Sequence, residues 1–446
     1  MSYRPRFSTL FALALVLVAA LLAGTAVLLN VSARPRAGKT VVTVRLWDEQ
    51  VAAAYRQSFA AFTRTHPDIE VHTDVVAYST YFTTLRTDVA GGSADDVFWI
   101  SNAYLAGYAD SGRLMDIGKN LGTGAASAWE PSVVEQFTRN GVLWAVPQLT
   151  DAGIALYYNA DLLAAAGVDP AELATLRWSP GGGDTLRPLL ARLTVDADGR
   201  TAATPGFDAG RTRQWAYNAA NDAQGIYLNY IGSAGGVFQN GDRFAFDNPG
   251  AVEAFTYLVR LIDGDHVAPP ASDTNDNGDF SRNQFLAGRM ALFQSGTYNL
   301  AAVANQAGFR WGVAMLPEGT KGRVTVTNGI AAAGNSASAH PDAVRQVLAW
   351  MGSNEGNQYV GLHGSAIPAV RSAQRVYFDY WAAKNVDVRP FFTVLNGPRI
   401  NAPGGAGFPA GNQALEPYFD DMFLGRSDVA TTLRQAQKAA NAAARR

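Results

Sequence analysis

The sequence has 446 residues, of which 48% are hydrophobic, and a formal net charge of −2. At about 100–200 residues per domain, this length predicts two or three globular lobes. Lysine and arginine are scattered along the chain without a basic cluster, which argues against nucleic acid as a partner. The chain has no cysteine, so thiolate nucleophiles, disulfides, cysteine zinc sites and a lipid-anchored cysteine are excluded.

The N-terminal region contains one long apolar segment. No charged residue lies between Arg6 and Arg34, and residues 10–29 are mostly alanine, leucine and valine. This matches the roughly 20 apolar residues that cross a bilayer. Two alternatives follow: an uncleaved signal anchor that tethers the chain to a membrane, or a signal peptide cleaved after Ala33. In both, residues 1–40 are a signal segment and linker, and the body of the chain is exported and extracytoplasmic.

Strand and helix patterns alternate after this segment. Strands are predicted at 41–47, 69–76 and 95–100, with helices at 51–65 and 81–89 between them. A β-α-β-α-β order implies a parallel sheet with helices on both faces. Ligands of such sheets bind beyond the carboxyl ends of the strands. This rule groups the residues that follow the first and third strands: Trp47, Asp48, Glu49, Ser101 and Asn102.

The rest of the chain repeats this mixed pattern. Two strands are predicted around Pro147, and residues 401–411 form a coil rich in proline and glycine. Helices are predicted at 213–219, 251–263, 281–286, 341–353 and 428–444.

Motifs of common enzymes are missing from the sequence. The five histidines are spread singly, and there is no HExxH, GxSxG or GxxxxGK[ST] motif. Residues 273–284 resemble a calcium loop in spacing, but Gln284 stands where such loops need a bidentate carboxylate. A self-hydrogen-bonded turn is the favoured interpretation of that segment. We therefore expect no metal ion, no cofactor and no catalytic residues.

Aromatic residues near strand ends and helix starts are the remaining feature that indicates a function. Each one alone is compatible with core packing. Together with nearby carboxylates and amides they match a sugar, which offers C–H faces to aromatic rings and hydroxyls to polar side chains. The aromatic residues are Trp47, Trp99, Tyr104, Trp215, Tyr227, Tyr298, Trp381 and Phe408. The polar ones are Asp48, Glu49, Asn102, Asp151, Asp222 and Gln224.

Several longer motifs occur in a fixed order over about residues 41–440. They include "FTRTHPDIEVHTDVV", "SADDVFWISNAYLAGYADSGRLMDI", "GVLWAVPQLTDAGIALYYNADLLAAAGVDP", "FLAGRMALFQSGTYNL" and "WGVAMLPEG". Their order resembles the extracytoplasmic solute-binding proteins of carbohydrate ABC importers, the group that includes the maltodextrin-binding protein. Two departures stand out: the letters "ADD" replace a common Pro-Asp pair, so the placement of Asp95 and Asp96 is in doubt, and the family's lipid-anchoring cysteine is missing.

The resemblance implies an α/β fold of the periplasmic-binding-protein type (type II). Two lobes, each a mostly parallel sheet flanked by helices, would hinge about a ligand cleft. The implied N-lobe contains residues 41–149 and about 297–345. The implied C-lobe contains about 150–296 and 346–446, with a crossing between lobes near Gly296.

The same matching implies a set of ligand-binding residues. Tyr298 would stack on the sugar where relatives more often carry tryptophan, and Gly296 would let the backbone approach the ligand. A tyrosine that only packs a helix start is the alternative. The full set is Trp47, Asp48, Glu49, Asn102, Tyr104, Asp151, Asn221, Asp222, Gln224, Gly296, Tyr298, Asn328 and Gly329.

The implied function is the substrate-binding subunit of an ABC importer. It would act as a monomer, bind a sugar or oligosaccharide by hinge closure, and deliver it to the permease membrane subunits without catalysis. Alternatives are an exported polysaccharide-active enzyme, a sensor ectodomain, and the same fold with a polyamine or ferric ligand.

Overall fold

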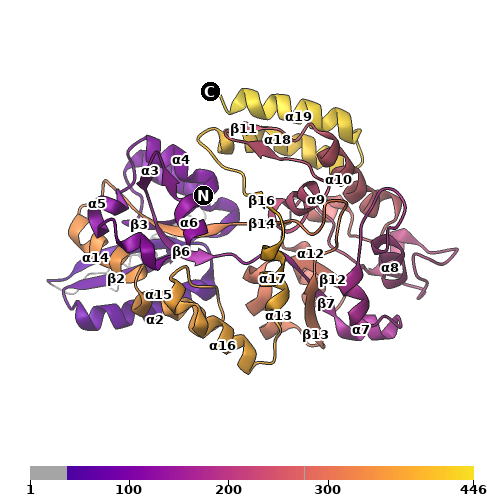
Figure 1. Cartoon of the computed structure of the whole chain (residues 1–446), viewed down its shortest axis with the longest axis horizontal. Helices are drawn as coiled ribbons and strands as arrows, with labels where there is room; N and C mark the ends of the chain where they lie inside the picture. Colours follow the sequence, from indigo (N-terminus) through magenta and orange to yellow (C-terminus); the bar gives the residue numbers. More distant parts are fainter. Residues whose placement is uncertain (1–37, 276, 446) are drawn as a thin grey trace, which may run out of the picture.

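The structure of the protein is a computed structural model that describes residues 38–275 and 277–445. Two lobes lie side by side along the long axis (Figure 1). The first lobe contains a five-stranded sheet of order β2-β1-β3-β15-β6. β1 pairs in parallel with β2 and β3, whereas β15 runs antiparallel to β3 and β6. In chain order its strands are β1 (Thr40–Leu46), β2 (Ile69–Val75), β3 (Val97–Ser101), β6 (Val146–Thr150) and β15 (Gly329–Gly334).

Helices cover both faces of the first sheet. Right-handed crossovers from β1 to β2 and from β2 to β3 place the first two helices, α2 and α3, on opposite faces. α4 follows β3 beside α3, and α15 packs against α2 on the other face (Figure 1). The helices of this lobe are α2 (Glu49–Thr65), α3 (Tyr78–Gly91), α4 (Asn102–Asp110), α5 (Ile117–Leu121), α6 (Pro131–Gln136), α14 (Pro341–Met351) and α15 (Asn354–Leu362).

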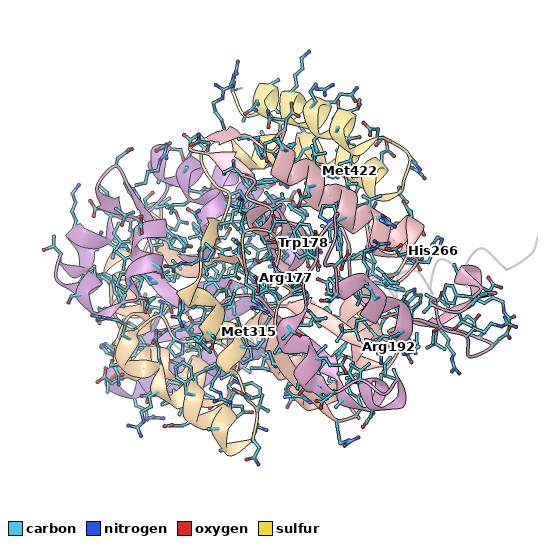
Figure 2. All side chains as sticks on the ribbon, turned by 45° about the vertical axis from the view of Figure 1, so that its right-hand side comes forward. Arg177, Trp178, Arg192, His266, Met315 and Met422 are labelled. Atoms are coloured by element: carbon cyan, nitrogen blue, oxygen red, sulfur yellow. The ribbon has the colours of Figure 1, made fainter. Side chains whose placement is uncertain are left out.

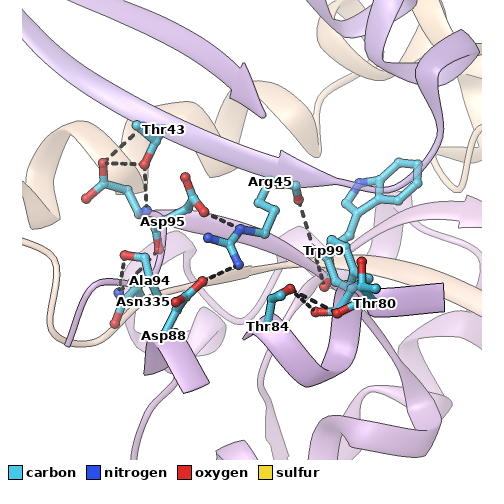
Figure 3. A network of polar contacts seen from close by, with 11 residues as sticks. Thr43, Arg45, Thr80, Thr84, Asp88, Ala94, Asp95, Trp99 and Asn335 are labelled. Atoms are coloured by element: carbon cyan, nitrogen blue, oxygen red, sulfur yellow. Dashed lines mark hydrogen bonds and ion pairs between the residues drawn. The ribbon is translucent and has the colours of Figure 1, made fainter. Parts of the chain in front are cut away.

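A buried polar network fastens the strands of this lobe to α3. The guanidinium of Arg45 lies 2.7 Å from Asp88 and 2.5 Å from Asp95 (Figure 3). Asp96 accepts a hydrogen bond from the backbone N–H of Thr43 at 3.0 Å. Both carboxylates of the "ADD" departure therefore serve the first lobe's own packing.

The second lobe contains a three-stranded sheet of order β12-β7-β13. β7 is antiparallel to both neighbours, so the prediction of a mostly parallel sheet in each lobe fails for this sheet. The physical reason is that β7 enters from the first lobe and lies between β12 and β13, which run in the same direction and are joined through α13. The strands are β7 (Ala155–Asn159), β12 (Leu292–Ser295) and β13 (Trp311–Met315).

Helices build most of the second lobe around a large apolar core. Trp178 is buried there, and its indole N–H donates to the hydroxyl of Ser233 at 3.1 Å (Figure 2). The helices are α7 (Ala160–Ala165), α8 (Leu186–Leu193), α9 (Leu228–Ser233), α10 (Pro249–Val259), α11 (Ala271–Thr274), α12 (Phe280–Leu286), α13 (Leu300–Gln306), α16 (Arg375–Ala383), α17 (Arg389–Thr393), α18 (Phe408–Phe423) and α19 (Val429–Ala443). The first lobe has one pair of short strands, β4 (Thr138–Arg139) with β5 (Val142–Leu143). The second lobe has three such pairs: β8 (Val195–Asp196) with β9 (Thr212–Gln214), β10 (Gln239–Asn240) with β11 (Arg243–Phe244), and β14 (Thr325–Thr327) with β16 (Arg399–Asn401).

The chain passes between the lobes at positions that differ from the predicted boundaries. Residues 297–327, predicted in the N-lobe, lie in the second lobe, because β13 pairs with β7 and β14 pairs with β16. Residues 346–373, predicted in the C-lobe, pack on the first lobe, because α14 and α15 bury apolar side chains in its core. The crossings are at 151–154, at 328 and between α15 and α16. Gly296 is therefore not at a crossing.

Within the described ranges, no helix is long and apolar enough to cross a membrane. The predicted apolar segment at 10–29 and the predicted cleavage after Ala33 lie outside those ranges.

Candidate functional site

The residues that follow β1, β2 and β3 lie toward the second lobe, because Arg282 and Asp222 of that lobe act on Asp48 and Tyr78, and Gly404 lies beside Asn102. An aromatic cluster follows these strands. The ring of Trp47 lies 5.6 Å from that of Tyr78 and 4.9 Å from that of Trp99. Tyr104 stacks on Phe82 with ring centroids 3.8 Å apart. Tyr78 is 63% exposed, so this cluster presents a free aromatic surface.

A second exposed ring comes from the other lobe. Tyr298 lies on the short 3-10 helix η6 (Thr297–Asn299) after β12 and is 42% exposed. Its ring lies over the Cα of Gly296, where a Cβ would overlap ring carbons. The hydroxyl of Tyr157 donates to the carbonyl of Gly296 at 2.8 Å. Glycine is needed at 296 so that Tyr298 can fold back over the backbone, with its exposed part directed to solvent.

Two carboxylates act on both exposed tyrosines. Desolvation raises the pKa of Tyr78, and the charges of Asp222 and Asp151 raise it further. Desolvation also raises the pKa of Tyr298, again with contributions from Asp222 and Asp151. Because Tyr78 is 63% exposed and Tyr298 is 42% exposed, water screens these effects, and the informative point is which groups exert them. Tyrosines from opposite lobes therefore lie near the same pair of acids.

Asp151 lies at the first crossing between lobes. Its backbone N–H donates to the carbonyl of Asn328 at 2.9 Å, which joins the first and second crossings. Its Oδ2 accepts from the amide of Gln224 at 2.9 Å. Burial raises the pKa of Asp151 to about 7, and the Gln224 hydrogen bond opposes that rise.

Asp222 is the N-cap of a helical turn that leads into α9. Its Oδ1 accepts from the backbone N–H of Gly225 at 2.9 Å. Burial raises the pKa of this carboxyl as well. We call Tyr78, Asp151, Asp222, Gln224 and Tyr298 the interlobe site, because they come from both lobes and one crossing, Gln224 bonds Asp151, and both acids act on both tyrosines.

Asp48 and Glu49 follow β1 but point to different surroundings. Asp48 caps α2 by accepting from the backbone N–H groups of Gln50 and Val51 at 2.8 and 3.0 Å. Burial raises its pKa, while the hydrogen bonds from Val51 and Gln50 and, to a smaller extent, the positive charge of Arg282 in the second lobe lower it. Glu49 instead pairs with Arg56 on α2 at 2.8 Å and is not brought to the interlobe site.

Other predicted positions are occupied by contacts within the protein. The amide of Asn221 donates to Asp420 on α18 at 2.9 Å. Gly329 packs so closely on Val133 that a Cβ would overlap it. Asn328 accepts from the backbone N–H of Gly329 at 3.0 Å. Asn102 lies beside Gly404 of the second lobe.

The sequence patterns did not single out Tyr78, Arg282 or Glu416, whose charge raises the pKa of Tyr104. Tyr78 follows β2 at the carboxyl edge of the sheet, so the rule that selected Trp47 and Asn102 would have found it. Arg282 on α12 and Glu416 on α18 are helix residues, and no local pattern separates them from other surface charges.

The arrangement offers binding groups, and among the described residues no three histidine, aspartate or glutamate side chains are placed so that they could hold a metal ion. In the calcium-like segment, Asp273 lies within α11 and the amide of Asn275 donates to the carbonyl of Asp420 at 3.2 Å. A surface hollow of about 510 Å³ beside Trp129 and Arg371 contains none of the interlobe groups.

Comparisons with known proteins agree with this architecture. UspC of M. tuberculosis, known from a crystal structure, is 79% identical, with a TM-score of 0.73 over 91% of this chain and 100% of that chain. The ABC substrate-binding protein Lmo0181 from Listeria monocytogenes, solved in complex with cycloalternan, is 20% identical, with a TM-score of 0.77 over 91% of this chain and 98% of that chain. The likeness to Lmo0181 shows the fold alone.

A probable ABC transporter-binding protein of Deinococcus radiodurans is 28% identical over 298 residues. That match covers 65% of this chain and 65% of the relative's own length, which is less than two thirds. The family model of bacterial extracellular solute-binding proteins matches residues 47–358, more than half of the chain. The chain therefore belongs to the family of bacterial extracellular solute-binding proteins.

Proposed function

We propose that this solute-binding protein binds a sugar or oligosaccharide at the interlobe site and delivers it to the permease subunits of an ABC importer. The observation that carries the proposal is that two exposed tyrosine rings, Tyr78 and Tyr298, come from opposite lobes and that the charges of Asp151 and Asp222 act on both. The Listeria protein of the same fold binds cycloalternan, which supports a carbohydrate ligand.

The chemistry of the site suits a saccharide. Aromatic rings on both lobes stack on the C–H faces of a sugar, worth about 0.5–1.5 kcal/mol per contact beyond buried area. Carboxylate oxygens of Asp151 and Asp222 accept hydrogen bonds from sugar hydroxyls, and the amide of Gln224 both donates and accepts. Since these groups come from two lobes and a crossing, a bound sugar draws the lobes together by hinge motion.

The protein acts outside the cytoplasm as a monomer and carries out no reaction. If residues 10–29 stay uncleaved, they tether it to the membrane beside the permease. Closure of the lobes on the sugar presents a surface that the permease distinguishes from the open form. Sugar uptake into proteoliposomes that contain the permease subunits tests delivery: no uptake above the level without this protein would contradict it.

Thermal-shift screening tests the ligand class. A ligand at about 100 times its Kd stabilises the native state by about 2.7 kcal/mol, which raises Tm measurably. The panel should contain mono-, di- and oligosaccharides, spermidine and ferric ion. A Tm rise with a saccharide, without products after prolonged incubation, supports the proposal. A rise with spermidine or ferric ion alone reassigns the ligand, and released sugar products assign an enzyme.

A further inference from the structure

A glycine-rich segment of the second lobe touches the first lobe at Asn102, directly after β3. Residues 402–407, here called the strap, lead from β16 to α18. A Cβ on Gly404 would stand 2.9 Å from the amide nitrogen of Asn102 and 3.2 Å from its carbonyl oxygen. Asn102 begins α4 of the first lobe, so the strap spans the gap between lobes (Figure 1).

One side chain holds the strap in place. The amide of Gln239 donates to the carbonyl of Gly404 at 2.6 Å and accepts from the backbone N–H of Gly404 at 2.7 Å. Gly405 has a φ of +107°, which favours glycine and turns the chain beside Asp242. Gln239 and Asp242 belong to the hairpin of β10 and β11. The hairpin therefore fixes the strap against α4.

Further groups meet on the same side of the gap. Ala103 on α4 packs against the core of the second lobe. Desolvation raises the pKa of Tyr104, and the charge of Glu416 on α18 raises it further. The hydrogen bond to Asp110 raises the pKa of Arg139, and Asp242 of the hairpin adds to it. α18 also contacts α4 directly, so the two lobes meet over a wider area than the strap alone.

The chain bounds the interlobe site on the opposite side too. α4 stacks on α3, as the Phe82 and Tyr104 rings show, and both lie on one face of the first sheet. α15 packs against α2 on the other face and leads into α16 of the second lobe. The strap and the α15–α16 crossing therefore stand at opposite ends of the gap, above and below it in Figure 1.

We infer that the strap is an end wall of the ligand site, which stops a saccharide from extending past Asn102 and Gly404 and so favours a short one. The inference rests on the proposed function, because it assumes a saccharide between Tyr78 and Tyr298. Gln239 is a positioning residue: it holds the wall and thereby sets the length of sugar that fits.

Binding of matched sugars of different length tests the wall. The probes are maltose with maltohexaose and cellobiose with cellohexaose, measured by calorimetry. Wild type should prefer the disaccharide, and Gln239→Ala, which frees Gly404, should shift that preference toward the hexasaccharide at least about tenfold. Gln214→Ala is the control, because Gln214 also bonds a backbone carbonyl, that of Leu193, at 2.7 Å within the second lobe. Equal affinities for short and long sugars in wild type, or no shift in Gln239→Ala, would overturn the inference.

Cross-linking tests the wall without a ligand. The chain has no cysteine, so Asn102→Cys combined with Gly404→Cys introduces the sole pair of thiols. Oxidation should form this disulfide in the intact protein. Adding Gln239→Ala should slow its formation several-fold. The control pair, Glu49→Cys combined with Gly404→Cys, should form no disulfide. Failure of the first pair to cross-link overturns the wall. If the pair cross-links but no sugar binds wild type, the proposed function fails and the structural contact stands.

Discussion

Tyr298 offers an exposed ring whose removal separates binding from folding. Tyr298→Ala should weaken saccharide binding about tenfold, because one stacking contact of about 0.5–1.5 kcal/mol and its buried area are lost. Tyr298→Phe keeps the ring and should keep most of the affinity. Calorimetry with the saccharide that raises Tm most gives the measurement.

Tyr380→Ala is the matched control for Tyr298. Tyr380 is half-buried on α16, where the ammonium of Lys384 lies 5.1 Å from its ring. Its loss should leave affinity unchanged. Unchanged affinity in Tyr298→Ala itself would return Tyr298 to a packing role at the start of its helix.

Asp151 makes a prediction about stability and pH. Burial raises the pKa of Asp151 from 3.8 to about 7, so the folded chain holds this proton more tightly than the unfolded chain does. As pH rises from 3.8 to about 7, the unfolded state loses the proton first, and the contribution of Asp151 to stability falls. Asp151→Asn has no carboxyl to titrate at this position, so its stability does not fall for this reason. Its Tm relative to wild type should therefore be higher at about pH 8 than at about pH 4.

Asp161 supplies a control with the opposite sign. The hydrogen bond from Arg310 lowers the pKa of Asp161, so its contribution to stability grows as pH rises. Because this pKa is lowered from 3.8, the Tm of Asp161→Asn relative to wild type should fall as pH rises to about 5 and stay level above it. An equal Tm difference between Asp151→Asn and wild type at about pH 4 and at about pH 8 would contradict the raised pKa of Asp151.

Residue types and motif order predicted four groups that the structure brings together: Asp151, Asp222, Gln224 and Tyr298. Glu49 was predicted at the site, but its side chain pairs with Arg56, which is farther along α2 and exposed. Which partner Glu49 pairs with depends on the direction of its side chain, and sequence spacing does not predict that direction. Tyr78 follows the second strand of the sheet, and the strand-end rule places it at the same edge as the residues after the first and third strands.

At the scale of elements, the junction of β12 and η6 depends on the fit between Gly296 and Tyr298. Gly296→Ala places a methyl group where the ring lies, so the ring must move. We expect a loss of about 1–3 kcal/mol in the free energy of unfolding, together with weaker sugar binding. In a Tyr298→Ala background the methyl group meets no ring, and both effects should shrink. A double-mutant cycle by denaturant unfolding and calorimetry measures this coupling. Additive effects would contradict the packing described here.

Most helices followed their sequence pattern, and the failures have tertiary causes. The predictions at 251–263, 281–286 and 428–444 are confirmed within a few residues by α10 and the turn after it, α12 and α19. The helix predicted at 213–219 is wrong. There the backbone of Ala216 and Tyr217 pairs with Val267 and Leu292, so contacts from distant segments override local preference.

At the scale of the whole molecule, length and motif order predicted two lobes but not how the chain divides between them. The apolar face of α14 shows that it is buried, yet either core would bury it equally well. Its place in the first lobe follows from the path of β15, which returns to the first sheet between β3 and β6. The connectivity of a two-lobed protein is thus a property of strand pairing over long sequence distances.

The first crossing gives a prediction for motion between the lobes. Gly153 lies in this crossing, and its N–H donates to the carbonyl of Phe391 at 2.8 Å. A Cβ there would overlap Val394 and stand 3.1 Å from that carbonyl oxygen, so the crossing is pressed against α17 and the turn after it. Gly153→Ala must push the crossing away from this support, at a cost of about 1–3 kcal/mol.

Small-angle scattering with and without the bound saccharide measures the effect on hinge motion. Wild type should become more compact with ligand, because the lobes close on it. In Gly153→Ala the ligand-free protein should have a different radius of gyration and a smaller ligand-induced change, since the crossing starts from a displaced position. Gly308→Ala is the control, because a Cβ at Gly308 meets nothing within 4 Å. Identical scattering of Gly153→Ala and wild type in both states would show that the packing of this crossing does not set the angle between the lobes.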